Sequence, residues 1–104
     1  MNRQIFHKEG ATLRIMLPRE VDHHAAEEIR SAADHILETE LIGQLIFDFS
    51  GTEFMDSSGI GMILGRYKRV RFMGGAVRLT AVSERVGRLL AMGGVYQMIG
   101  KEEE

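Results

Sequence analysis

The sequence predicts a single α/β domain with a mixed, mostly parallel β-sheet and helices packed against it. Short apolar runs alternate along the chain with longer segments whose apolar residues recur at helical spacing. This alternation is typical of parallel strands joined by crossover helices. The run QLIFDF after Gly43 is almost continuously apolar, as in a strand covered on both faces. With 104 residues the chain has room for one domain, which we place at residues 1–100, followed by a flexible tail at 101–104.

The first half of the chain predicts two strands and a long helix before that buried strand. Residues 4–7 and 11–17 are apolar-rich and flank Glu9-Gly10, as in a hairpin or a meander. Asp22 stands where a helix N-cap is expected, and the helix extends to about residue 39. Its apolar stripe is predicted to comprise Ala25, Ile29, Ala32 or Ala33, and Ile36.

The second half predicts a helix that begins at Asp56 or Ser57 and ends at Gly74-Gly75. Its buried side is predicted to comprise Ile60, Ile63, Leu64, Tyr67 and Val70 or Arg71. Gly61 and Gly65 each lower helix propensity by about 1 kcal/mol relative to Ala. Their presence predicts close packing against the sheet as compensation.

The last third predicts one more strand, AVRLTAV, and a short helix capped by Ser83 and ended by Gly93-Gly94. Residues 95–99 predict a final short strand. Of the seven methionines, we expect Met62 and Met92 to be packed on their helices.

Composition excludes several classes of function. The chain has no Cys, so disulfides and thiolate metal sites are excluded, and its histidines form no H-x-x-x-H pair. The net charge of −2, with signs interspersed, argues against nucleic-acid binding. No apolar run approaches the ~20 residues of a membrane helix, and the N-terminus lacks the features of a signal peptide. We therefore expect a cytoplasmic monomer without metal or cofactor, bound to neither nucleic acid nor membrane.

The most informative segment is FMDSSGIGMILGRYK, residues 54–68. Asp56, Ser57, Ser58 and Gly59 open a predicted helix, where unpaired N–H groups and the positive end of the helix dipole favour a phosphate. Asp and Ser are also the commonest N-cap residues. The residues by themselves therefore leave two roles open, helix capping and phosphorylation.

This segment resembles the phosphorylation segment of bacterial anti-sigma factor antagonists, which carry the STAS fold. Asp22-His23-His24 and the later RVGRLLAMGGVYQMI are similar to that family in order and spacing, so the resemblance covers nearly the whole chain. The motif is most similar to the sporulation branch, whose members free the forespore sigma factor F. In that family the first Ser after the Asp accepts the phosphate, which corresponds to Ser57.

The resemblance implies a partner-switching cycle. The unphosphorylated protein would bind an anti-sigma factor that is also a nucleotide-bound serine kinase, and so release the sigma factor. Phosphorylation of Ser57 would end this binding, and a PPM-type phosphatase would restore it. The resemblance also puts the loop at Asp22 beside the motif, so Asp22 either caps its helix or contacts the partner. We predict partner contacts at Asp22, Met55, Asp56, Ser57, Ser58 and Gly59, with Met55 at the partner surface.

Two alternatives stay open. An antagonist in another circuit, such as the general stress response, would carry the same motif. A serine-nucleophile enzyme or a nucleotide-hydrolysing STAS module belongs to a different class. The chain has no G-x-S-x-G elbow and no G-x-x-x-x-G-K-[ST] loop, so we predict that it is not an enzyme.

Overall fold

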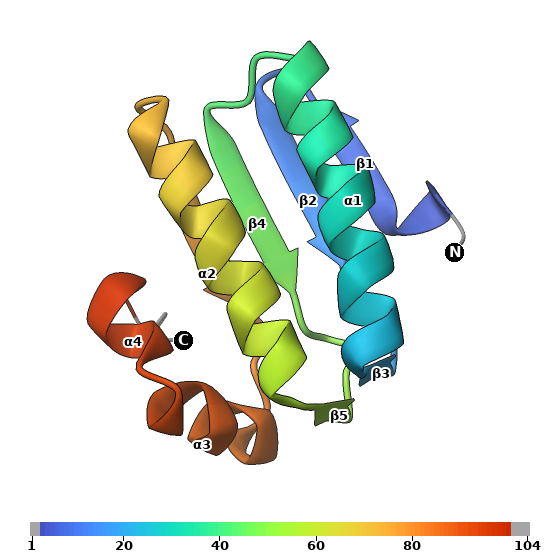
Figure 1. The fold of residues 1–104 in the computed structure, drawn as a ribbon, viewed down its shortest axis with the longest axis vertical. Helices are drawn as coiled ribbons and strands as arrows, with labels where there is room; N and C mark the ends of the chain where they lie inside the picture. Colours follow the sequence, from blue (N-terminus) through green and yellow to red (C-terminus); the bar gives the residue numbers. More distant parts are fainter. Residues whose placement is uncertain (1–2, 101–104) are drawn as a thin grey trace.

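The computed structural model describes residues 3–100, and the predicted tail at 101–104 lies outside them. A four-stranded sheet of order β1-β2-β4-β6 forms the centre (Figure 1). It is built from β1 (Phe6–Glu9), β2 (Thr12–Met16), β4 (Gln44–Asp48) and β6 (Ala76–Thr80), after a 3₁₀ turn, η1 (Arg3–Ile5). The β1–β2 hairpin is antiparallel, while β2, β4 and β6 are parallel. The predicted mixed, mostly parallel sheet is confirmed.

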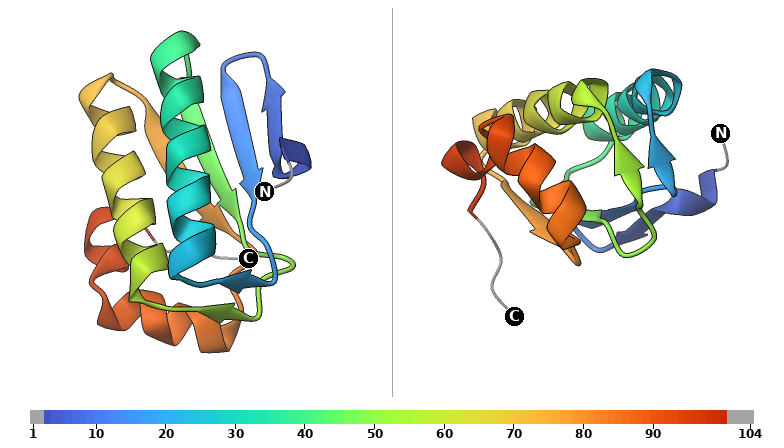
Figure 2. Two further views of the ribbon diagram at one scale, coloured as in Figure 1. Left: turned by 45° about the vertical axis from the view of Figure 1, so that its right-hand side comes forward. Right: turned by 90° about the horizontal axis from the view of Figure 1, so that it is seen from below.

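Two long helices lie side by side on one face of this sheet, α1 (His23–Thr39) and α2 (Ser57–Phe72) (Figures 1 and 2). Two shorter helices follow, α3 (Glu84–Met92) and α4 (Val95–Met98), of which α4 contacts α2. As predicted, the Ser83 hydroxyl caps α3 by accepting a hydrogen bond from the Val86 N–H at 3.1 Å. No helix within residues 3–100 has the length and apolarity needed to cross a bilayer.

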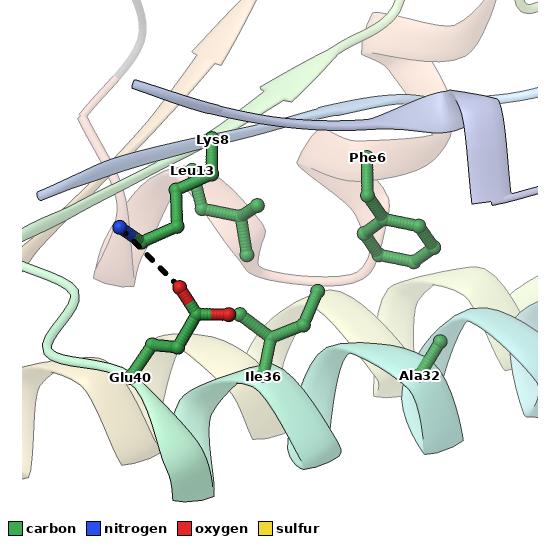
Figure 3. Close-up of a pocket in the computed structure, with 6 residues that line it drawn as sticks. All are labelled: Phe6, Lys8, Leu13, Ala32, Ile36 and Glu40. Atoms are coloured by element: carbon green, nitrogen blue, oxygen red, sulfur yellow. Dashed lines mark ion pairs between the residues drawn. The ribbon is translucent and has the colours of Figure 1, made fainter. Parts of the chain in front are cut away.

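The core lies between the sheet and the two long helices. The sheet contributes the fully buried side chains Leu13, Ile15, Leu45, Phe47 and Leu79. The facing side of α1 is Ala26, Ile29, Ala33 and Leu37, and that of α2 includes Met62, Ile63 and Val70. The predicted stripe of α1 is confirmed at Ile29 and Ala33, whereas Ala26 and Leu37 are buried in place of Ala25 and Ile36. Ala32 and Ile36 line an open hollow beneath β1 (Figure 3).

Three predictions about the last strand, Met92 and the helix glycines are wrong. Residues 95–98 form a helix and not a strand: Val95 and Ile99 lie four positions apart, so one helical turn buries both. Met92 is 85% exposed. Gly61 and Gly65 do not pack closely, since a Cβ atom at either would meet nothing within 4 Å.

Candidate functional site

A second, smaller sheet holds the starts of the two long helices together. It consists of β3 (Glu20–Val21) and β5 (Phe54–Met55), paired in parallel. The ladder continues past β5, where the Asp56 N–H donates to the Val21 carbonyl at 3.1 Å. Because β3 leads into α1 and β5 leads into α2, this pairing brings the N-termini of both helices side by side (Figures 1 and 2).

An aspartate caps each of these helix starts. The carboxylate of Asp22 accepts a hydrogen bond from the Ala25 N–H at 2.9 Å, and that of Asp56 accepts one from the Ser58 N–H at 2.8 Å. The capping role predicted for Asp22 is therefore confirmed. Ser57 is the first residue of α2 and is exposed, and its hydroxyl takes no part in the cap. A modification at this hydroxyl would leave the helix start intact.

A histidine to which the sequence analysis assigned no role in the site also belongs to it. The Nδ1 atom of His23, at the start of α1, lies 3.3 Å from the hydroxyl oxygen of Ser58 on α2. The two residues are 35 positions apart in the chain. Only the position of His23 directly after the predicted cap Asp22 could have indicated its place in the site.

Met55 and Gly59 lie beneath the surface of the site. Met55 is only 5% exposed, so the expectation that it lies at the partner surface is wrong. A Cβ atom at Gly59 would come within 2.6 Å of the Met55 Cγ atom. Strand neighbours point to opposite sides, and Phe54 is accordingly the residue of β5 that faces outward, with 47% exposure. The sequence analysis missed Phe54 as a surface residue of the site.

Gly59→Ala is expected to lower the free energy of unfolding by about 1–2 kcal/mol, because the added methyl group must displace the Met55 side chain. Gly61→Ala on the same helix is the matched control, since open space surrounds it. We expect this control to raise the free energy of unfolding by about 1 kcal/mol through helix propensity. Urea denaturation of both variants measures the difference, and equal effects would show that Gly59 is not required for packing.

An ion-pair network joins α1 to α2 behind the site. The Asp34 carboxylate on α1 lies 3.0 Å from Nε of Arg66 and 3.5 Å from Nη1 of Arg69, both on α2. Burial lowers the pKa of the Arg66 guanidinium, and the charge of Asp34 acts in the opposite direction. Arg69 also reaches Glu38 at 3.4 Å. The network fixes the two helices, and with them the two capped helix starts.

Comparison with known proteins identifies the family. Residues 3–103 match the family model of the STAS domain. The chain belongs to the STAS domain family. The resemblance stated from the sequence is therefore confirmed, and this STAS domain is also 35% identical over 101 residues to an anti-sigma F factor antagonist of Paenibacillus polymyxa. That alignment covers 95% of this chain and 86% of the relative.

Solved structures agree with this STAS assignment. The domain is similar to the anti-sigma factor antagonist SpoIIAA in its unphosphorylated form, with a TM-score of 0.72 and 30% identity over 84% of this chain and 82% of that chain. It is also similar to Bacillus SpoIIAA in the phosphorylated form, with a TM-score of 0.69 and 29% identity over 95% of this chain and 92% of that chain. The same fold is thus known with and without a phosphate.

Proposed function

We propose that this STAS domain is an anti-sigma factor antagonist that is switched by phosphorylation of Ser57. The observation that carries the proposal is the exposed position of Ser57 in the first turn of α2. Asp56 caps this helix, so the Ser57 hydroxyl is not needed for the cap. Its relatives that are anti-sigma F factor antagonists support this function. In the cytoplasm the unphosphorylated form binds an anti-sigma factor serine kinase carrying a nucleotide, and the sporulation sigma factor F is released. A PPM-type phosphatase resets the cycle.

The proposed contact surface is centred on the two helix starts. It comprises Asp22, Asp56, Ser57 and Ser58, while Gly59 and Met55, both predicted as partner contacts, are buried and pack together beneath it. We add Phe54, a half-exposed aromatic side chain directly before the motif. Aromatic residues are frequent anchors at the centres of interfaces, so Phe54 supplies apolar contact area beside the polar motif.

Charge at this surface accounts for the switch. A phosphoserine adds about 1.5 to 2 negative charges at neutral pH, next to the carboxylate of Asp56. Docking must remove water from these charges, which is costly without a compensating partner. The helix behind them is anchored by Met62, Ile63 and Val70, all buried. Phosphorylation therefore acts locally, since moving α2 would break close packing.

The Ser58–His23 contact also raises the question of an enzyme, because a serine beside a histidine is a nucleophile–base arrangement. Such a pair needs a third group that orients the histidine. Asp22 precedes His23, but its carboxylate accepts from the Ala25 N–H as the cap of α1. The pair is also exposed. These features support a binding role for the site over a catalytic one.

Ser57→Ala tests the assignment of the modified residue. Incubated with the cognate anti-sigma factor kinase and ATP, the wild type is expected to gain one phosphate at Ser57, as mapped by mass spectrometry. Ser57→Ala should gain none and should stay bound to the kinase. Ser58→Ala is the matched control and should still be phosphorylated. A phosphate on Ser58 or Ser50 of the wild type would refute the assignment.

A further inference from the structure

The imidazole of His23 reaches across from α1 to the start of α2. Its Nδ1 atom is 3.3 Å from the hydroxyl of Ser58, the residue that follows the proposed modification site. The β3–β5 pairing sets the distance between the two helix starts. Its last residue pair directly precedes the capping aspartate of each helix. The backbone of the fold therefore places His23 next to the first turn of α2, where its side chain reaches Ser58.

Within residues 3–100, several other donors at this corner are already engaged. The backbone N–H groups of Ser58 and Gly59 already donate to the side chain and to the carbonyl of Asp56, at 2.8 and 3.0 Å. Arg19, which precedes β3, is paired with Glu53 at 3.1 Å. The histidine side chain is thus the group best placed to donate to the phosphate.

We infer that His23 binds the phosphate of phosphorylated Ser57, its imidazolium Nδ1–H donating to a phosphate oxygen in place of the contact with Ser58. The inference rests on the proposed function, because it assumes that Ser57 is the modified residue. It assigns His23 a positioning role: the imidazolium partly neutralises the phosphate in the free protein and orients it on the contact surface. This role is distinct from that of Asp56, which caps the helix.

Carboxylates flank His23 at the starts of both helices. Asp22 caps α1, the helix that carries His23, and Glu27 lies on that helix. Asp56 caps the neighbouring helix α2. The charge of His23 is among the causes that hold the pKa of the Glu27 carboxyl below its usual value, after the dominant hydrogen bond from Arg30. A phosphate dianion would add a further negative group on the side of α2.

His24 provides a matched control for this inference. It is adjacent to His23 in the chain, but it is directed along its own helix, with Nε2 3.7 Å from a carboxylate oxygen of Glu28. Its side chain is 87% exposed. Replacing either histidine by Gln removes one titratable group and keeps a hydrogen-bonding side chain of similar size. The two variants therefore differ in position and not in chemistry.

The experiment uses full-length protein in which phosphoserine is incorporated at position 57 during translation, so that no kinase is required. The pKa of the phosphoserine is measured by ³¹P NMR titration in the wild-type background, in His23→Gln and in His24→Gln. A cation within hydrogen-bond distance lowers the pKa of a phosphate, so we expect a pKa about half a unit higher in His23→Gln than in wild type. We expect no change in His24→Gln.

An unchanged phosphoserine pKa in His23→Gln would overturn the inference, and so would an equal shift in both variants, which would indicate a general loss of positive charge. As a second readout, the ring resonances of His23 should move when Ser57 is replaced by phosphoserine, while those of His24 stay in place. Neither measurement depends on the kinase or on the sigma factor. Failure of the proposed function would appear separately, as a phosphate mapped to another residue after kinase treatment.

Discussion

Ser57→Asp is expected to weaken binding to the anti-sigma factor by roughly a hundredfold, or about 2–3 kcal/mol. The new carboxylate stands next to Asp56 on a surface that must lose water on docking, where like charges repel and desolvation is costly. Isothermal titration calorimetry of both proteins with the nucleotide-bound partner measures the difference. One carboxylate carries less charge than a phosphate, so weak residual binding is expected.

Ser57→Asn separates charge from size in this experiment. Asn has nearly the shape of Asp without its charge, so this variant should bind within about tenfold of the wild type. In the free protein neither substitution should change the free energy of unfolding by more than about 0.5 kcal/mol, because Ser57 is exposed and the cap belongs to Asp56. If both variants lose the same amount of binding affinity, the larger side chain and not its charge causes the loss. Charge would then no longer explain the switch.

Asp34→Ala is expected to be the most destabilising of the proposed substitutions, with a loss of about 2–4 kcal/mol in the free energy of unfolding. The side chains of Asp34 and Arg66 are 19% and 11% exposed, so removal of the carboxylate leaves a largely buried guanidinium without its counter-ion. Arg30 and Arg69 also lie within 3.5 Å of the same carboxylate, and their repulsion would add to the loss. Guanidinium chloride denaturation measures the effect.

Two further variants distinguish the origin of this effect. Glu53→Ala removes an exposed partner, since Arg19 and Glu53 are 72% and 66% exposed, and should change stability by no more than about 0.5 kcal/mol. The double variant Asp34→Leu/Arg66→Met replaces the buried pair by apolar side chains and should recover most of the loss. If Asp34→Ala behaves like Glu53→Ala, the network does not hold α1 to α2.

Local signals in the sequence were sufficient for the main elements. The starts of α1 and α2 followed from Asp22 and Asp56, because a capping aspartate before an apolar stripe has a direct backbone cause. The buried strand β4 followed from the continuous apolar run after Gly43. The position of the Asp22 loop beside the motif came from the family resemblance, and in the structure the parallel β3–β5 pair brings the two together.

Other features depend on contacts between distant segments and could not be derived locally. The strands β3 and β5 have two residues each, too few to display a period. The short apolar run at residues 95–98 fits a strand or a helix equally well. Met55 and Gly59 pack together because β5 turns directly into α2, and the contact of His23 with Ser58 spans 35 positions of the chain.

The small β3–β5 ladder gives the site a free energy of local opening that differs from the free energy of unfolding of the whole domain. Local openings of a protein have free energies from near zero up to that of global unfolding, according to the contacts that they break. Opening this ladder separates two strands of two residues each, whereas exposing Phe47 requires the whole sheet to come apart. We therefore expect the ladder to open at a lower free energy than the domain unfolds, with exposure of the buried Met55 as the main cost. The backbone before Ser57 is already extended in the closed ladder, so such an opening changes its accessibility and not its conformation.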